Sequence, residues 1–172
     1  MAIITLNNRA TNRSDTASAG QVFTATSATA ADFQAGGVNT PLFRVKRSAS
    51  QSIGNASFTK IAFDSEVFDP QNTFASNKFT PAVAGYYYLG ASIGFSGATD
   101  FNDMLIAIYK NGSSISKAGG AYWNYDTRKT FVIDLADAND YYEVYAYQNS
   151  GGSKDLSDNA SYTQFFGNKL IG

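Results

Sequence analysis

The residues of this chain that could perform acid-base chemistry are paired carboxylates. Asp64 with Glu66, and Asp134 with Asp137, have the close spacing that suggests glycoside hydrolysis by two carboxylates. Each pair is expected on a β-strand and its adjoining turn, where charges are mostly exposed or lie at an interface. The chain has no Cys and no His, which excludes thiolate nucleophiles, Ser-His-Asp triads, and zinc or haem sites with those ligands. We therefore expect no enzymatic activity and no cofactor.

Two further acidic pairs lie in predicted loops and offer oxygen ligands for calcium. They are Asp100 with Asp103, and Asp155 with Asp158. Neither pair has the dense acidic spacing of an EF-hand loop. We interpret them as solvated surface carboxylates and expect no metal site.

Aromatic and polar side chains gather in three long connections, residues 96–102, 119–128 and 149–160. In an antiparallel sandwich successive connections alternate between the two ends, so all three are expected at one end, where binding usually resides. Exposed rings beside Asp and Asn suit a glycan or a polar cell-surface epitope. The candidate receptor contacts are Asp100, Phe101, Tyr122, Trp123, Asn124, Tyr125, Asp126, Lys154 and Asp155. The alternative is that residues 122–125 pack on their own sandwich or against a neighbouring subunit.

The elements that would position these loops are β-strands. From Leu42 onward, short apolar runs alternate with turn residues, which is typical of an all-β sandwich. Strands are predicted over residues 43–48, 58–63, 78–81, 86–95, 104–110, 113–118, 129–135, 141–148 and 161–170. Asn111-Gly112 predicts a tight hairpin, because a type I′ turn needs positive φ at both central residues.

Several predicted strands are apolar on both faces, although a strand of an isolated sandwich should be apolar on one face. Residues 104–109, 141–148 and 86–88 all show this pattern. If one face meets the core, the second must be covered either by loops of the same subunit or by a partner. Tyr suits a subunit interface that is partly exposed to water, because it buries a large area and keeps a hydroxyl for hydrogen bonding.

The run from Phe58 to Phe95 resembles the globular head of the complement C1q and tumour-necrosis-factor superfamily. The resemblance rests on the spacing of Phe63, Asp69, Phe74, Phe79, Gly85 and Tyr87, and on later blocks such as IAIYKNGSSIS, TFVIDL, YYEVYAYQNSG and YTQFFGNKL. The family has a slightly longer gap between the Phe74 and Phe79 equivalents, and aromatics where this chain has Leu89 and Ala91.

This resemblance implies an all-β jelly-roll sandwich that assembles as a homotrimer around an axis lined by aromatic strands. The residues that it places at the trimer interface are Tyr86, Tyr88, Tyr141, Tyr145 and Tyr147.

Residues 1–40 differ in composition from the rest, being rich in Ala, Thr, Ser and Asn, and cannot form a core of their own. We expect an extended arm held by a neighbouring chain or partner, followed by the head over residues 41–172. Thr29 and Asp32, followed by Gly36-Gly37, predict a short capped helix over residues 29–34. The arm also looks like segments found near the N-termini of bacteriophage fibre proteins.

The net charge of −1, without a large basic cluster, makes nucleic acid a poor partner. The chain lacks a membrane-length apolar run and a signal peptide, so we expect synthesis in the host cytoplasm and no membrane insertion. We interpret the chain as a virion protein that contacts other virion proteins through residues 1–40. Its expected role is that of a trimeric tail-fibre or receptor-binding tip that contacts a host surface glycan or protein. The alternatives are a capsid decoration or cement protein without a receptor, and a bacterial C1q-like binding module.

Overall fold

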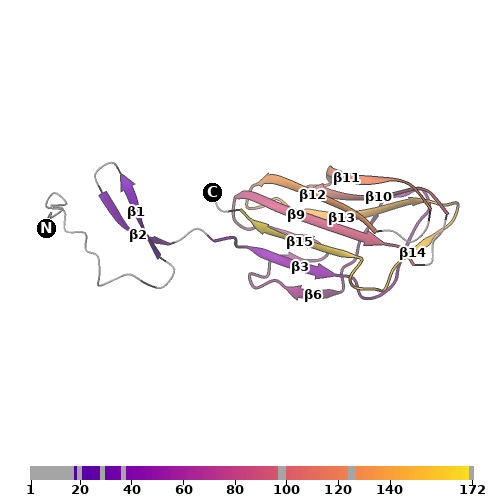
Figure 1. Cartoon of the computed structure of the whole chain (residues 1–172), viewed down its shortest axis with the longest axis horizontal. Helices are drawn as coiled ribbons and strands as arrows, with labels where there is room; N and C mark the ends of the chain where they lie inside the picture. Colours follow the sequence, from indigo (N-terminus) through magenta and orange to yellow (C-terminus); the bar gives the residue numbers. More distant parts are fainter. Residues whose placement is uncertain are drawn as a thin grey trace, which may run out of the picture. The chain divides into compact units, whose positions relative to one another are not determined.

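The computed structural model describes residues 18, 21–27, 30–35, 38–96, 100–123 and 127–170. Within these residues the regular secondary structure consists of β-strands, with no helix. The chain divides into two units, Met1–Val38 and Asn39–Gly172, and each is described by itself (Figure 1).

The first unit contains an antiparallel hairpin. Strand β1 (Gln21–Ser27) pairs with β2 (Ala30–Ala35) in a register that places Phe23 opposite Phe33. The helix expected over residues 29–34 is therefore wrong. A single helical turn makes few backbone hydrogen bonds, whereas β1, which contains Val, Phe and Thr, offers these residues a ladder of partners.

The second unit is a sandwich of two antiparallel sheets (Figure 1). The five-stranded sheet has the order β12-β9-β15-β3-β6, and the six-stranded sheet has the order β11-β10-β13-β8-β7, with β5 also paired to β13. A short pair, β14-β4, forms a separate two-stranded sheet. The strands are β3 (Leu42–Lys46), β4 (Gln51–Ile53), β5 (Thr59–Lys60), β6 (Ser65–Phe68), β7 (Phe74–Ala75), β8 (Lys78–Phe79), β9 (Gly85–Gly94), β10 (Asp100–Lys110), β11 (Ser113–Trp123), β12 (Thr127–Ala136), β13 (Tyr142–Asn149), β14 (Lys154–Leu156) and β15 (Gln164–Lys169).

Each strand predicted from the sequence is present, which confirms the all-β sandwich. The strand expected over residues 58–63 is reduced to β5, and β11 extends beyond its expected end to Trp123. Within this unit, the short strands β4, β6, β7 and β14 were not predicted from the sequence.

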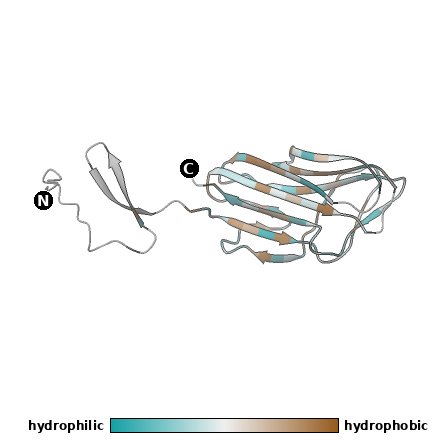
Figure 2. Cartoon of the chain, viewed as in Figure 1, coloured by the Kyte–Doolittle hydropathy of each residue, from teal (hydrophilic) through white to brown (hydrophobic). Residues whose placement is uncertain are grey.

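The core fills the space between the two sheets. Phe43 of the five-stranded sheet stacks on Phe79 of the six-stranded sheet at a ring-centroid distance of 4.3 Å. Phe165 of β15 meets Phe43 edge-on at 4.9 Å. Figure 2 shows hydrophobic and hydrophilic residues alternating along these strands, as expected when one face of each sheet is buried.

The residues of the resemblance build one corner of this core. Asp69 is buried, and its carboxylate accepts hydrogen bonds from the Thr73 hydroxyl at 2.8 Å and the Phe74 backbone N–H at 2.7 Å. Gly85 has a φ of 146°, and an added Cβ would lie 2.5 Å from Cε of Lys169. The buried Tyr87 donates its hydroxyl to the Val83 carbonyl at 2.7 Å, and burial raises the pKa of Tyr87 to about 12. The residues that carry the resemblance thus make hydrogen bonds and close contacts that stabilise this corner of the core.

The strand ends that flank the three predicted connections lie at one end of the sandwich, as predicted, although β10, β11, β12 and β14 take up part of the predicted loop ranges. The register pairs Thr127 with Gly94 and Trp123 with Asp100, and the Ser96 N–H donates to the Asp155 carbonyl at 2.9 Å. The Asn111-Gly112 turn lies at the other end, with φ values of 49° and 80°. The predicted hairpin is therefore confirmed.

A charged network joins the two sheets at the Asn111-Gly112 end. The Lys110 ammonium of β10 lies 2.8 Å from an Asp134 carboxylate oxygen on β12 and 3.0 Å from an Asp140 oxygen. It also donates to the Leu135 carbonyl at 2.6 Å. The Tyr142 hydroxyl of β13 donates to Asp134 at 2.6 Å. Burial, reinforced by the Asp134 carboxylate, raises the pKa of Tyr142, so this hydroxyl stays a donor.

Candidate functional site

The five-stranded sheet turns an apolar surface away from the core. Four large side chains on this surface are about half exposed: Ile133 at 62%, Leu135 at 57%, Tyr86 at 56% and Phe131 at 48%. The register pairs Leu135 with Tyr86 and Ile133 with Tyr88, so these residues lie side by side on β12 and β9. We call the surface formed by Tyr86, Tyr88, Phe131, Ile133, Leu135 and Phe166 the apolar face.

Three rings form the centre of the apolar face. Tyr88 and Phe131 are parallel to within 4° at a centroid distance of 6.0 Å, and each lies 6.4 Å from Phe166 of β15. The Phe166 and Phe131 rings lie over Gly90, where an added Cβ would lie 2.5 Å from a Phe166 ring carbon and 2.8 Å from a Phe131 ring carbon. Glycine at this position therefore lets the rings lie against the sheet.

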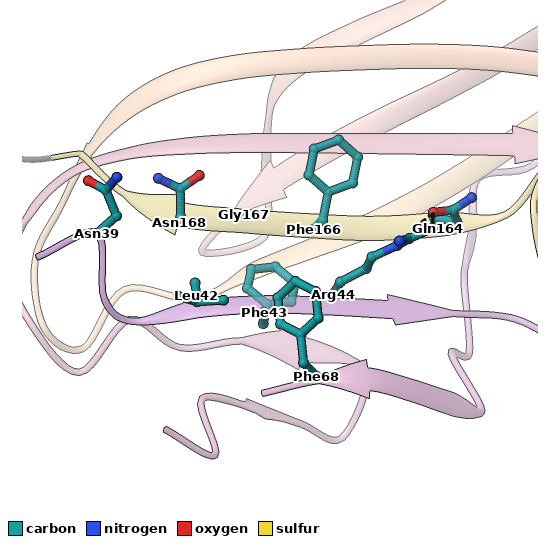
Figure 3. Close-up of a pocket in the computed structure, with 9 residues that line it drawn as sticks. All are labelled: Asn39, Leu42, Phe43, Arg44, Phe68, Gln164, Phe166, Gly167 and Asn168. Carbon is teal, nitrogen blue, oxygen red and sulfur yellow. Dashed lines mark hydrogen bonds between the residues drawn. The ribbon is translucent and has the colours of Figure 1, made fainter. Parts of the chain in front are cut away.

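An open hollow of about 600 Å³ lies at the other edge of the same sheet surface (Figure 3). Its apolar walls come from Leu42, Phe68 and Phe166. Arg44 extends toward Gln164, and its Nε and Nη2 atoms donate to Gln164 Oε1 at 3.0 and 2.8 Å. The full set of lining residues is Asn39, Leu42, Phe43, Arg44, Phe68, Gln164, Phe166, Gly167 and Asn168.

The structure divides the five predicted interface tyrosines between the two sheets. Tyr86 and Tyr88 lie on the apolar face, whereas Tyr145 and Tyr147 belong to β13 of the six-stranded sheet, and Tyr141 directly precedes β13. These five residues therefore do not form one surface.

The second face of β13 is covered in part by the chain itself. Phe58 lies 5.1 Å from Tyr147, and Tyr109 of β10 lies 4.3 Å from Tyr145, measured between ring centroids. Ala107, beside Tyr145 in the register, is fully buried. Side chains of the same subunit, one from the connection before β5 and one from β10, therefore cover part of this surface, as the alternative reading expects.

No family model and no curated protein sequence matches the chain. Among solved structures it is similar to murine APRIL at pH 5.0, with a TM-score of 0.60 and 14% identity over 75% of this chain and 98% of that chain. The globular domain of zebrafish complement 1qA protein gives 0.58 and 15% over 76% and 97%, and Eiger TNF from S. frugiperda gives 0.54 and 8% over 76% and 90%. The chain has a C1q/TNF-like jelly-roll fold. At these identities the likeness establishes the fold alone.

Sequence reasoning missed most of the apolar face of this C1q/TNF-like head. The sequence places Phe131, Ile133 and Leu135 on the strand predicted over residues 129–135 without assigning them to a surface, and it does not single out Phe68 and Phe166. The residues at positions 131, 133 and 135 are all apolar and alternate with Thr130, Val132 and Asp134. This pattern predicts one apolar face that meets the core, so the sequence gives no sign that the apolar set is the exposed one.

The predicted receptor contacts that the structure describes lie at the end of the head opposite the Asn111-Gly112 turn. Phe101 is 7% exposed and packs 5.0 Å from Phe95, so it is a core residue and not the exposed contact that we expected. The backbone of Asp100 begins β10, and Tyr122 and Trp123 end β11. Asp155 of β14 is exposed and Lys154 is half-buried. Asn124, Tyr125 and Asp126 lie outside the described residues.

The carboxylates considered for chemistry serve the fold of the head. Asp64 accepts hydrogen bonds from the Ser48 and Ala49 backbones at 2.7 and 3.0 Å. Burial alone would raise the pKa of Asp64, but these hydrogen bonds and that from the Ser48 hydroxyl hold it below the usual value. The Asp134 carboxylate forms an ion pair with Lys110 and accepts a hydrogen bond from the Tyr142 hydroxyl.

No group of three or more His, Cys, Asp or Glu side chains is placed to hold a metal ion in the part of the chain that the structure describes. Nor do the described residues include a helix long and apolar enough to cross a membrane.

Proposed function

We propose that this chain is a non-enzymatic, homotrimeric binding head with which a bacteriophage particle attaches to the surface of its host. The observation that carries the proposal is the apolar face. Contiguous large side chains on one side of a sheet, half exposed, mark a surface that a partner covers.

The size of the apolar face supports association of whole subunits. A large side chain has on the order of 200 Å² of surface, so four half-exposed side chains contribute roughly 400 Å² to one partner. A specific interface buries about 800 Å² on each partner, of which somewhat more than half is apolar. The apolar face therefore supplies most of the nonpolar area that a stable contact needs.

A homotrimer is favoured over other assemblies by the resemblance of the sequence and by the fold. In a threefold assembly the exposed apolar face would place the five-stranded sheets toward the axis. The long connections, which lie at one end of the sandwich, would then be presented three times in one direction. Three copies of a weak site bind with far higher avidity than one copy.

The phage context is supported by the composition of residues 1–40 and by their likeness to N-terminal segments of fibre proteins. In this role the segment docks the head to the particle, and the long-connection end contacts a glycan or protein of the host. The outer surface of the six-stranded sheet is covered in part by its own side chains, which leaves the loops as the recognition surface.

Two measurements test the proposal. The first is the mass of the full-length protein by light scattering, with three times the chain mass expected. The second is binding of fluorescently labelled protein to bacteria that the parent particle infects. Saturable binding is expected, and it should be lost in the Tyr122→Ala, Trp123→Ala, Tyr125→Ala triple variant.

The matched control is Val83→Ala, because Val83 is exposed and follows Ala82, whose N–H donates to the Ala138 carbonyl at the opposite end. The control should bind the bacteria like the unmodified protein. Absence of binding by a trimeric protein would refute the attachment role and would leave a structural role on the particle, such as capsid decoration. A monomeric mass would refute the assembly.

A further inference from the structure

We propose that the outer surface of the six-stranded sheet binds an acidic polysaccharide. The site consists of Phe58, Tyr109, Lys117, Tyr145 and Tyr147, which we call the ring surface. It goes beyond the proposed function, in which the loops recognise the host. The side chains that cover part of this sheet are themselves the site, and they would hold a chain of sugar rings through stacking and charge.

Aromatic rings from three segments of the chain lie side by side on the ring surface. Tyr145 of β13 lies 4.3 Å from Tyr109 of β10, measured between ring centroids. Phe58, which precedes β5, lies 5.1 Å from Tyr147 and 6.2 Å from Tyr109. All four rings are half-buried, so each is packed on one side and keeps some area open to solvent. Rings that are already held by packing lose little conformational entropy when a ligand covers them.

Ammonium groups lie on both sides of these rings. The register sets Lys117 of β11 and Lys60 of β5 on the same row as Tyr145, one on each side of it, roughly 14 Å apart between backbones. Lys60 forms an ion pair with Glu143 at 2.7 Å. Lys117 is exposed, with its Nζ 5.4 Å from the centroid of the Phe58 ring, and it makes no ion pair among the residues described. The ring surface therefore has a free positive charge at its edge.

A second ammonium group of this kind lies at the other end of the same strand. Nζ of Lys78 on β8 is 4.9 Å from the centroid of the Tyr141 ring, and Lys78 has no ion pair within the described part of the chain. Tyr141 and Tyr147 are six residues apart, which is roughly 20 Å along a strand. Rings and cations thus follow one another over a length that suits several linked sugars.

These groups fit the chemistry of an acidic polysaccharide. Sugar rings have apolar C–H faces that pack on aromatic rings, and Tyr offers such a face together with a hydroxyl for hydrogen bonding. Lys78 and Lys117 complement acidic groups spaced along the polymer. Single-stranded nucleic acid carries a charge on every nucleotide and is bound by many cations, whereas here Lys60 is already offset by Glu143. A sparsely charged glycan is therefore favoured.

Fluorescence anisotropy with the full-length protein tests the proposal. The probes are labelled oligosaccharides of galacturonate, alginate and heparin, with a labelled malto-oligosaccharide of equal length as the neutral control. We expect saturable binding of at least one acidic probe, at least about fivefold tighter than the neutral one, and weaker binding as salt is raised. Absence of binding to all three acidic probes, or equal binding of the neutral probe, would overturn the proposal. Equal or tighter binding of labelled oligo(dT) would overturn it in favour of nucleic acid.

Two variants with matched controls locate the site. Lys117→Met should weaken binding by about three- to fivefold, and Tyr147→Ala by about fivefold or more. The controls are Lys129→Met, at an exposed Lys of β12 on the other sheet, and Tyr162→Ala, at a Tyr that is 43% exposed. Both controls should bind like the natural protein. Because Lys117 is exposed, its replacement should leave the circular dichroism spectrum unchanged, and equal affinity of this folded variant and the natural protein would overturn the site.

The loop variant separates this proposal from the attachment role. The Tyr122→Ala, Trp123→Ala, Tyr125→Ala triple variant should keep its affinity for the acidic probe while it loses binding to host cells. Loss of probe binding in the triple variant would overturn the ring surface as the site. A protein that attaches to host cells and ignores every acidic probe would refute this inference and leave the proposed function standing. Probe binding by a protein that does not attach to cells would support the ring surface and refute the attachment role alone.

Discussion

Replacing Lys110 by Met tests whether the charged network at the Asn111-Gly112 end holds β12 against the six-stranded sheet. Met keeps an unbranched apolar stem but removes the ammonium group. The Asp134 and Asp140 carboxylates then lose a partner at 2.8 and 3.0 Å, and the Leu135 carbonyl loses a donor at 2.6 Å. Because β12 carries Phe131, Ile133 and Leu135 of the apolar face, we expect the variant also to weaken the proposed association of subunits.

The expected loss in the free energy of unfolding lies between the contributions of exposed and of buried ion pairs. The Lys110 side chain is 21% exposed, and Asp134 and Asp140 are 26% and 15% exposed. Exposed pairs contribute about 0.2–1 kcal/mol, whereas hydrogen bonds to charged groups away from water contribute about 1.5–3 kcal/mol. With three interactions lost in a partly screened site, the free energy of unfolding should fall by about 2–3 kcal/mol.

The pH dependence of the free energy that this network contributes follows from two pKa shifts, one downward for Asp140 and one upward for Lys110. Hydrogen bonds from Asn111 and the Asp137 backbone, with help from Lys110, lower the pKa of Asp140, so its contribution is present above about pH 4 and is lost as the pH falls through the folded-state pKa. Burial alone would lower the pKa of Lys110, but its bonds to Asp134 and Asp140 raise it. The Lys110 contribution is therefore full below about pH 10.4 and is lost as the pH rises through the raised pKa.

Urea unfolding followed by far-ultraviolet circular dichroism, at one protein concentration, measures the loss. The difference between the natural protein and Lys110→Met should be largest between about pH 5 and 9 and should shrink toward both extremes. Lys46→Met is the control, because Lys46 is half-buried and makes no ion pair among the residues described. A loss below about 0.5 kcal/mol, or one equal to that of the control, would refute the reasoning.

Three further substitutions test other contacts by the same unfolding measurement. Gly90→Ala should lower stability by about 1–3 kcal/mol, because its Cβ would collide with Phe166 and Phe131, whereas Gly54→Ala, with no atom within 4 Å of the added Cβ, should be near neutral. Asp69→Ala should cost about 1–3 kcal/mol by leaving the buried Thr73 hydroxyl and Phe74 N–H unpaired, and Asp69→Asn should cost less since it keeps one acceptor. Phe43→Ala should cost about 3–5 kcal/mol, several times more than Phe68→Ala, because Phe43 is 1% exposed and Phe68 is 41% exposed. Similar losses within any of these matched pairs would contradict the assigned contacts.

The alternation of apolar residues was enough to predict most of the strands, but it does not say to which sheet a strand belongs. Tyr88 and Tyr145 both sit on strands with two apolar faces, yet they lie on different sheets. The difference comes from contacts across long sequence separations. Phe58 and Tyr109 cover part of the β13 surface, whereas no described side chain covers Ile133 to a similar degree.

The candidate site was predictable only in part, because it also depends on contacts across long sequence separations. The grouping of the long connections at one end followed from the alternation of turns, and the register confirms it. Phe101 was misjudged because the position of a loop boundary decides its burial, and β10 begins earlier than the sequence indicated. The hollow depends on side chains from β3, β6 and β15, which no local pattern brings together.

The central place of β15 in the five-stranded sheet has a consequence for the folding of the chain. β15 pairs with β9 on one side and β3 on the other, so neighbouring strands in the sheet are separated by much of the sequence. Such nonlocal topology is associated with folding in milliseconds to seconds. During synthesis, β3 and β9 have no partner between them until β15 leaves the ribosome. Their apolar surfaces are exposed in that interval, so aggregation competes with folding until synthesis reaches the last strand.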